Sequence, residues 1–129
     1  MKYRIILSLL IMSLIGCEKN TSQKEVEENI NFEMNPSFSS ISSSTTYDFK
    51  VTLKSKMPLG GVIIDIIAID EGSGTPILPQ ALGITSITSV SNLSVLNLPR
   101  QKWVETTVKV TSKQTATNSA TAKFRVIYK

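Results

Sequence analysis

Hydrophobic and polar residues alternate along most of the chain after its first thirty residues. In residues 46–54, aromatic and aliphatic side chains occupy every second position, and charged or hydroxyl side chains fill the positions between them. The same period of two recurs in residues 30–34, 104–111 and 122–128. Because successive side chains of a strand point to opposite faces, this spacing predicts half-buried β-strands with one face in a core.

Residues 62–69 follow a different pattern, with apolar side chains on both faces of the predicted strand and Asp65 as the only interruption. A strand of this kind is expected in the middle of a sheet or beneath a covering layer. A charge among isoleucines is costly unless it has a partner. We therefore expect Asp65 to accept backbone hydrogen bonds, or to pair with Lys109 or Arg125 across the sheet.

The region between residues 84 and 98 is less regular. Its apolar residues recur at every third position, as on a helix face, but the serines and threonines between them are poor helix formers. We predict one strand over 84–90 and another over 93–98. The alternation slips between Val95 and Leu96, which predicts a bulge or a bend.

Segments rich in proline, glycine, serine and asparagine separate these strands. Six or seven short strands in about 100 residues, with no convincing helix and no repeat, predict an all-β fold, namely an antiparallel two-sheet sandwich. A small barrel is the alternative. The predicted turns are 36–44, 58–61, 70–79, 99 and 114–119.

The order of strands and the alternation of faces over residues 29–129 resemble those of immunoglobulin and fibronectin type III domains. The run from Leu96 to Val104 is similar to the fibronectin-type leucine, proline and aromatic run that leads into the sixth strand, with Trp103 where a tyrosine corner would stand. The immunoglobulin cysteine pair and the tryptophan between them are missing. The resemblance implies an immunoglobulin-like, Greek-key sandwich and transfers no binding residues.

The first sixteen residues have the organisation of an export signal. Two positive charges, Lys2 and Arg4, precede an apolar run from Ile5 to Ile15. This run is well short of the ~20 residues that cross a bilayer as a helix. The pattern predicts a signal peptide over residues 1–16 that is removed after export.

The residues Leu14-Ile15-Gly16-Cys17 resemble the lipobox of bacterial lipoproteins. The resemblance implies that Cys17, the only cysteine, receives a diacylglycerol, and that the chain is cut before it and acylated on its new amino terminus. Two or more acyl chains make membrane anchoring stable. It also implies a cell-envelope location, in the outer membrane of a Gram-negative bacterium, with the periplasmic or surface face left open. An ordinary secretory signal with a chance cysteine is the alternative.

Removal of residues 1–16 leaves 129 − 16 = 113 residues, enough for one domain with a core. Because Lys2 and Arg4 are lost, 12 basic and 10 acidic residues remain, and no basic block is interleaved with aromatics. Nucleic acid is therefore not an expected partner. Residues 17–28 are polar and predict a flexible tether from the lipidated cysteine to the folded domain at 29–129. A short amphipathic helix is the alternative for this segment.

The chain contains no histidine, and its one cysteine is assigned to lipidation. These facts exclude Ser-His-Asp and Cys-His catalysis and the histidine- and thiolate-rich zinc sites. Carboxylates remain, but they form no motif for paired-acid catalysis. We expect no enzymatic activity, no catalytic residue, no metal and no cofactor. The carboxylates outside the tether considered for such chemistry are Asp65, Asp70, Glu71 and Glu105; a calcium site formed by the first three is a weaker alternative.

Two aromatic residues are candidates for ligand stacking. Tyr47 is in phase with Phe49 and is expected in the core. Trp103 precedes the inward-facing Val104, so strict alternation turns it outward. It either caps the end of the sandwich or forms a binding platform with the 70–79 loop.

The predicted function is a lipid-anchored, non-catalytic interaction or accessory module of the cell envelope. Its expected partners are membrane lipid, through acylated Cys17, and an envelope protein. The alternative is a binding module for carbohydrate or another small ligand at the cell surface, with Trp103 in the site.

Overall fold

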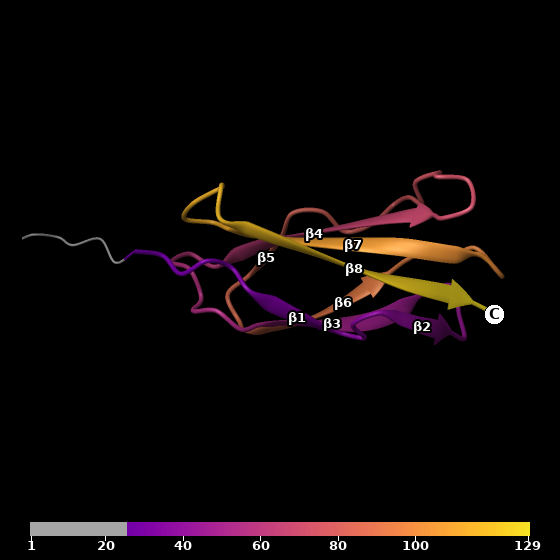
Figure 1. The fold of residues 1–129 in the computed structure, drawn as a ribbon, viewed down its shortest axis with the longest axis horizontal. Helices are drawn as coiled ribbons and strands as arrows, with labels where there is room; N and C mark the ends of the chain where they lie inside the picture. Colours follow the sequence, from indigo (N-terminus) through magenta and orange to yellow (C-terminus); the bar gives the residue numbers. More distant parts are fainter. Residues whose placement is uncertain (1–25) are drawn as a thin grey trace, which may run out of the picture.

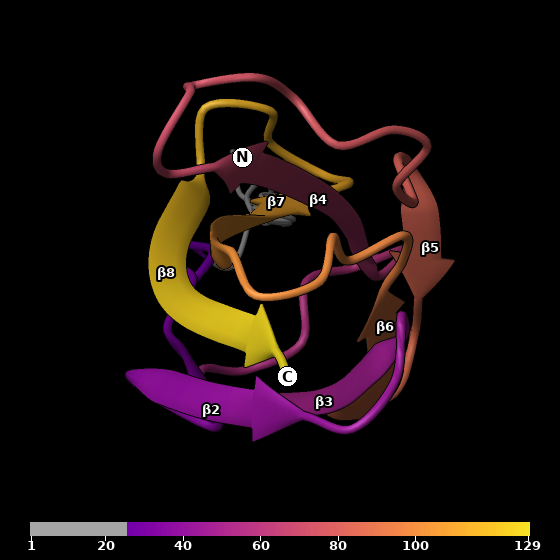
Figure 2. The same ribbon diagram turned by 90° about the vertical axis from the view of Figure 1, so that its right-hand side faces the viewer.

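The structure is a computed structural model that describes residues 26–129. Within these residues, eight strands form two facing sheets, and there is no helix (Figures 1 and 2). The smaller sheet has the order β1-β3-β6 and the larger one the order β2-β8-β7-β4-β5. The strands of the smaller sheet are β1 (Phe32–Asn35), β3 (Tyr47–Leu53) and β6 (Val90–Val95). Those of the larger sheet are β2 (Ser39–Ser42), β4 (Val62–Asp70), β5 (Ile84–Ser86), β7 (Trp103–Ser112) and β8 (Ser119–Tyr128).

This arrangement confirms the predicted all-β, immunoglobulin-like sandwich. The chain crosses between the sheets from β3 to β4 and from β6 to β7, as Greek-key connections require. Neighbouring strands are antiparallel except β2 and β8, which run parallel. The amino-terminal part of the domain is thus divided between the sheets, because β1 pairs with β3 and β2 pairs with β8.

The core lies between the sheets and is built from the positions that the alternation predicts. Along β7, buried and partly exposed side chains alternate, and Val104, Thr106 and Val108 are fully buried. Phe49 of the smaller sheet meets Phe124 of the larger one, with ring centroids 5.0 Å apart. Tyr47 packs against the edge of this core, as predicted, and its hydroxyl donates to Ser40 Oγ at 2.8 Å. Apolar burial across the two sheets is therefore the main source of stability.

The predicted turn over residues 36–44 is wrong in its middle, because Ser39–Ser42 forms β2. Serine has a low preference for strands, so nothing local indicates this element. It forms because β8 offers an edge with unpaired backbone groups, and Arg125 N–H donates to the Phe38 carbonyl at 2.8 Å where the pairing begins. Tertiary pairing here overrides local preference.

The bounds predicted between residues 84 and 98 are also wrong. β5 ends at Ser86, and β6 runs from Val90 to Val95. The slip in alternation marks the end of β6, since the backbone turns at Asn97, whose φ is 60°. Leu98 follows this turn outside any strand, yet it is buried and its N–H donates to the Thr45 carbonyl.

The strand with two apolar faces, β4, lies inside its sheet between β7 and β5, as predicted. The segment after β4 folds back along the same edge as β5. There Ile77 N–H donates to the Ala68 carbonyl at 2.8 Å, and Ile66 N–H donates to the Ala81 carbonyl at 2.9 Å. The outer face of β4 remains partly accessible, with Ile67 48% exposed.

The two ends of the sandwich differ in their relation to the chain termini (Figure 1). The chain leads into the domain from Val26 at one end, and β8 ends at the other. We call these the entrance end and the far end. The predicted signal peptide at 1–16, Cys17 and the tether up to residue 25 lie outside the described residues. Within 26–129, no helix has the length and hydrophobicity to cross a membrane.

Candidate functional site

Trp103 is the first residue of β7 and lies at the far end of the sandwich (Figure 1). Val104 beside it is fully buried, whereas Trp103 is half-buried, so the indole faces outward as predicted. Trp103 lies opposite Ile127 of β8, which in turn lies opposite Ile41 of β2. Side chains opposite one another on neighbouring strands share a face and touch. These three residues therefore form an apolar row across the outer face of the larger sheet.

An arginine lies over the ring of Trp103. The guanidinium carbon of Arg125 is 4.3 Å from the ring centroid, which is a cation–π contact. Glu71 holds this guanidinium through its carboxylate, with Arg125 Nε at 2.9 Å from Oε1 and Nη2 at 2.8 Å from Oε2. The Glu71 carboxylate raises the pKa of Arg125 by accepting these hydrogen bonds. The cation is thus fixed in place on the indole.

The loop after β4 places Glu71 there. Glu71 N–H donates to the Trp103 carbonyl at 3.0 Å, which ties the loop to β7. Asp70 stabilises the turn, because its Oδ1 accepts the Gly72 N–H at 2.9 Å. Its Oδ2 lies 3.4 Å from Lys102 Nζ. The hydrogen bond from Gly72, with a smaller contribution from Lys102, lowers the pKa of Asp70, so this carboxylate is ionised at neutral pH.

These groups line an open cavity of about 450 Å³ beside the indole. Two cations and two carboxylates border the cavity. They form two ion pairs in its wall, Lys102 with Asp70 and Arg125 with Glu71. Such a surface offers hydrogen bonds and an aromatic edge without a net charge. The lining residues are Asp70, Glu71, Gly72, Ser73, Lys102, Trp103 and Arg125.

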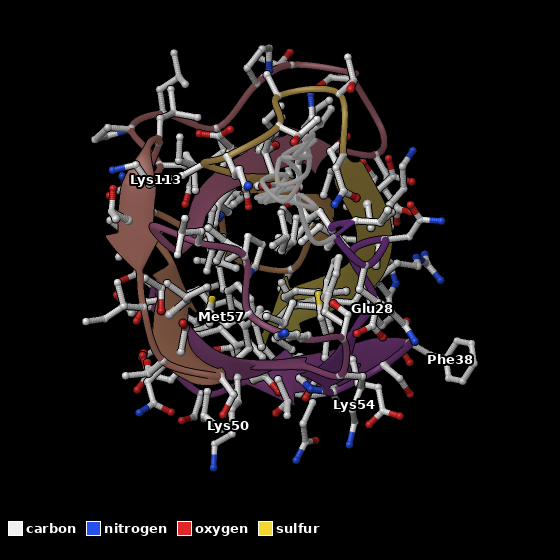
Figure 3. All side chains as sticks on the ribbon, turned by 90° about the vertical axis from the view of Figure 1, so that its left-hand side faces the viewer. Glu28, Phe38, Lys50, Lys54, Met57 and Lys113 are labelled. Carbon is white, nitrogen blue, oxygen red and sulfur yellow. The ribbon has the colours of Figure 1, made fainter. Side chains whose placement is uncertain are left out.

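Exposed apolar side chains continue the row toward the sheet edge. Ile41 is 60% exposed, and Phe38, just before β2, is 81% exposed and projects from the edge of the molecule (Figure 3). We call the group formed by Phe38, Ile41, Ile127, Trp103 and Arg125 the Trp103 surface. It combines apolar side chains with a fixed cation, which are the residue types enriched at the centres of protein interfaces.

The structure brings together Trp103 and the 70–79 loop, as the binding hypothesis requires, but places Asp65 elsewhere. Asp65 Oδ1 accepts the Gly83 N–H at 2.6 Å, which is the backbone hydrogen bond expected for it. Lys109 is its neighbour in register, while Arg125 is held by Glu71.

A shared calcium site is not formed by these carboxylates. Five residue-to-residue steps along the extended strand β4, roughly 17 Å, separate Asp65 from Asp70, which is too far for one ion. Within the part of the chain that the structure describes, no three acidic side chains gather as ligands.

The remaining candidate carboxylate, Glu105, pairs with Lys123 at 3.2 Å on the outer face of the sheet. Each of the four carboxylates considered for acid–base chemistry therefore has a partner in the fold: Asp65 with Gly83, Asp70 with Gly72 and Lys102, Glu71 with Arg125, and Glu105 with Lys123.

Sequence reasoning missed the roles of Glu71 and Arg125. Alternation alone places Arg125 on the outer face of its strand, since Phe124 and Val126 are inward. It does not indicate which residue of β7 lies beside Arg125, nor that the loop after β4 reaches β8. The predicted lipidation site, Cys17, lies outside the described residues.

The sequence matches no protein-family model, and no curated protein is significantly similar to it.

Proposed function

We propose that this protein is a lipid-anchored, non-catalytic module of the cell envelope that binds another envelope protein through the Trp103 surface. Acylated Cys17 anchors it in the outer membrane of a Gram-negative bacterium. The observation that carries the proposal is the position of the Trp103 surface relative to the chain. The tether leads to the entrance end, and the indole lies at the far end (Figure 1). An anchor on one end leaves the other free to meet a partner.

The Trp103 surface is also preorganised for binding. The Arg125 guanidinium is already ordered before a partner binds, because Glu71 and the indole hold it in place. Binding to groups that are fixed beforehand loses less conformational entropy. Ile41 and Phe38 supply exposed apolar area beside this fixed cation. A partner that covers them gains hydrophobic free energy at about 25 cal/mol for each Å² buried.

Photo-crosslinking from defined positions tests this function. A photoreactive residue is placed at Ile41, or at Leu82 as a control of similar exposure (60% and 68%) outside the Trp103 surface. After irradiation of intact cells, we expect one envelope protein to be linked in high yield from position 41 and not from 82. Arg125→Ala, made in the chain that carries the photoreactive residue at position 41, should abolish capture of that protein. Equal products from both positions, or none from position 41, would contradict the proposal.

A second candidate is a module for carbohydrate or another small ligand. The cavity beside Trp103 favours it, since about 450 Å³ is within the usual range for ligand sites. Arg125 covers one face of the indole, however, so a sugar ring has to use the other face or displace the guanidinium. Glycan-array binding by the wild type that Trp103→Ala loses, while its melting curve stays cooperative, would support this candidate.

A further inference from the structure

The entrance end of the sandwich exposes apolar side chains from separate loops. Leu59, between β3 and β4, is 77% exposed, and Ile87, between β5 and β6, is 74% exposed. Val26, where the described chain begins, is 94% exposed. All three line one open cavity of about 500 Å³, together with Met57 and Pro58. Exposed apolar side chains gathered at one end of a domain are typical of a surface that contacts a membrane or another protein.

The leucine is held outward by the backbone. Gly61 N–H donates to the Pro58 carbonyl at 3.0 Å and closes a turn with Leu59 near its tip. The Gly61 carbonyl accepts the Lys113 N–H at 3.0 Å, which fastens the turn to the loop between β7 and β8. Gly61 has a φ of 93°, a conformation that other residues rarely adopt. In the isolated domain, this turn therefore keeps the Leu59 side chain exposed to solvent.

Chain length determines what this end can reach. Only eight residues, or 26 − 17 = 9 backbone steps, connect Cys17 to Val26. At no more than ~3.6 Å for each residue, they span at most about 32 Å. If Cys17 is acylated, the entrance end stays within that distance of the lipid. The far end, where β8 stops, is separated from the tether by the length of the sandwich (Figure 1).

Charged side chains of both signs accompany the apolar tips. Lys113 projects from the β7–β8 loop at this end (Figure 3), beside the Leu59 turn, because its backbone N–H donates to the Gly61 carbonyl. A lysine beside exposed leucine and isoleucine can meet the phosphate of a lipid headgroup while the apolar side chains enter the interface. Two carboxylates, Glu27 and Glu28, line the same cavity, and Glu28 Oε2 accepts the Lys56 backbone N–H at 2.9 Å.

We infer that the entrance end docks on the bilayer, with the side chains of Leu59 and Ile87 in the headgroup region and Lys113 against anionic phosphate. This inference rests on the proposed lipid anchor. It adds that the domain has a defined orientation on the membrane, with the Trp103 surface turned away from it.

Spin labelling of the full-length lipidated protein in vesicles of phosphatidylethanolamine and phosphatidylglycerol tests the orientation. Since the only native cysteine is acylated, Leu59→Cys and Leu78→Cys each provide a unique site for a nitroxide. Leu78 is the matched control, 74% exposed on the segment that pairs with Ala68 near the far end. We expect the label at 59 to be relaxed several-fold more by oxygen, relative to a water-soluble nickel chelate, than the label at 78. Ile87→Cys provides a second position if Leu59→Cys folds poorly.

The outcomes separate this inference from the anchor on which it depends. A protein that floats with the vesicles but has water-like accessibility at 59 and 87 overturns the docking and leaves the anchor intact. A protein that does not float, with a free thiol at Cys17, overturns both. A label at 59 that becomes shielded from both relaxants only when an envelope extract is added shows a protein partner at this end and overturns the lipid docking.

Discussion

The hydroxyl of Thr106 lies in the core without a hydrogen-bond partner. Thr106 is fully buried on β7 between Val104 and Val108, and it faces the same side as Phe124 of β8. Among the described residues, its Oγ1 is a buried side-chain oxygen with no donor or acceptor within reach. Water hydrates this hydroxyl in the unfolded chain, and nothing replaces that water in the fold. We predict that Thr106→Val stabilises the protein.

The magnitude follows from the burial. An unpaired polar group in a core costs about 1–3 kcal/mol. Valine has the same branched shape as threonine and is equally suited to a strand, so the change creates no cavity and no strain. We expect the free energy of unfolding to rise by about 1–2 kcal/mol. For a domain of this size, this corresponds to an increase of roughly 4–8 °C in melting temperature for each kcal/mol.

Denaturant unfolding followed by the fluorescence of Trp103, the only tryptophan, measures this change. Val108→Thr is the matched control, because it adds a hydroxyl at the next inward position of the same strand, where the side chain is also fully buried. It should lower stability by about 1–3 kcal/mol. A less stable Thr106→Val, or a Val108→Thr without effect, would show that the core hydrates hydroxyls and would refute the reasoning.

Three further changes test other parts of the structure. Arg125→Ala uncovers one face of Trp103, so the fluorescence maximum should move to longer wavelength with a small fall in melting temperature; an unchanged spectrum would show that the cation–π contact is absent in solution. The pKa of Asp70 is lower in the folded state than its ordinary value of 3.8, so its contribution to stability is present above that pH and is lost as the pH falls toward the lowered pKa. Acid titration of the unfolding midpoint should therefore show a smaller loss below about pH 4 for Asp70→Asn than for the wild type, and equal losses would be inconsistent with the shift. Gly61→Ala should lower the free energy of unfolding by about 1–3 kcal/mol because of its left-handed backbone, and by more because the new methyl meets the backbone of β5. Gly74→Ala, with open space around the new methyl, should show the backbone effect alone. Thermal melts in which the two variants lose equal stability would argue against the contact at Gly61.

Period-two alternation predicted the long strands closely. β3, β7 and β8 appear where side chains alternate, because each has one face in the core and one in water. β2 could not be predicted in this way. Its serines bury little apolar surface, and it exists because β8 has an open edge for it. Strands that depend on pairing leave a weak signal in their own residues.

The candidate site was predictable only in part. Alternation around Val104 was sufficient to turn Trp103 outward. The contact with Arg125 depends on the register between β7 and β8, and the contact with Glu71 depends on the conformation of the loop after β4. Register and loop conformation are set by packing over the whole sandwich, so no local pattern near Trp103 indicates them.

Intact-mass and peptide mass spectrometry of the protein extracted from membranes is the most direct test of the central claim that a lipid anchor holds this domain in the envelope. The account predicts a mature chain that begins at Cys17, carries a diacylglycerol on its sulfur and an acyl group on its amino terminus, and moves to the soluble fraction in Cys17→Ser. A membrane-extracted protein with an unmodified Cys17 thiol, or one that retains residues 1–16, would contradict it.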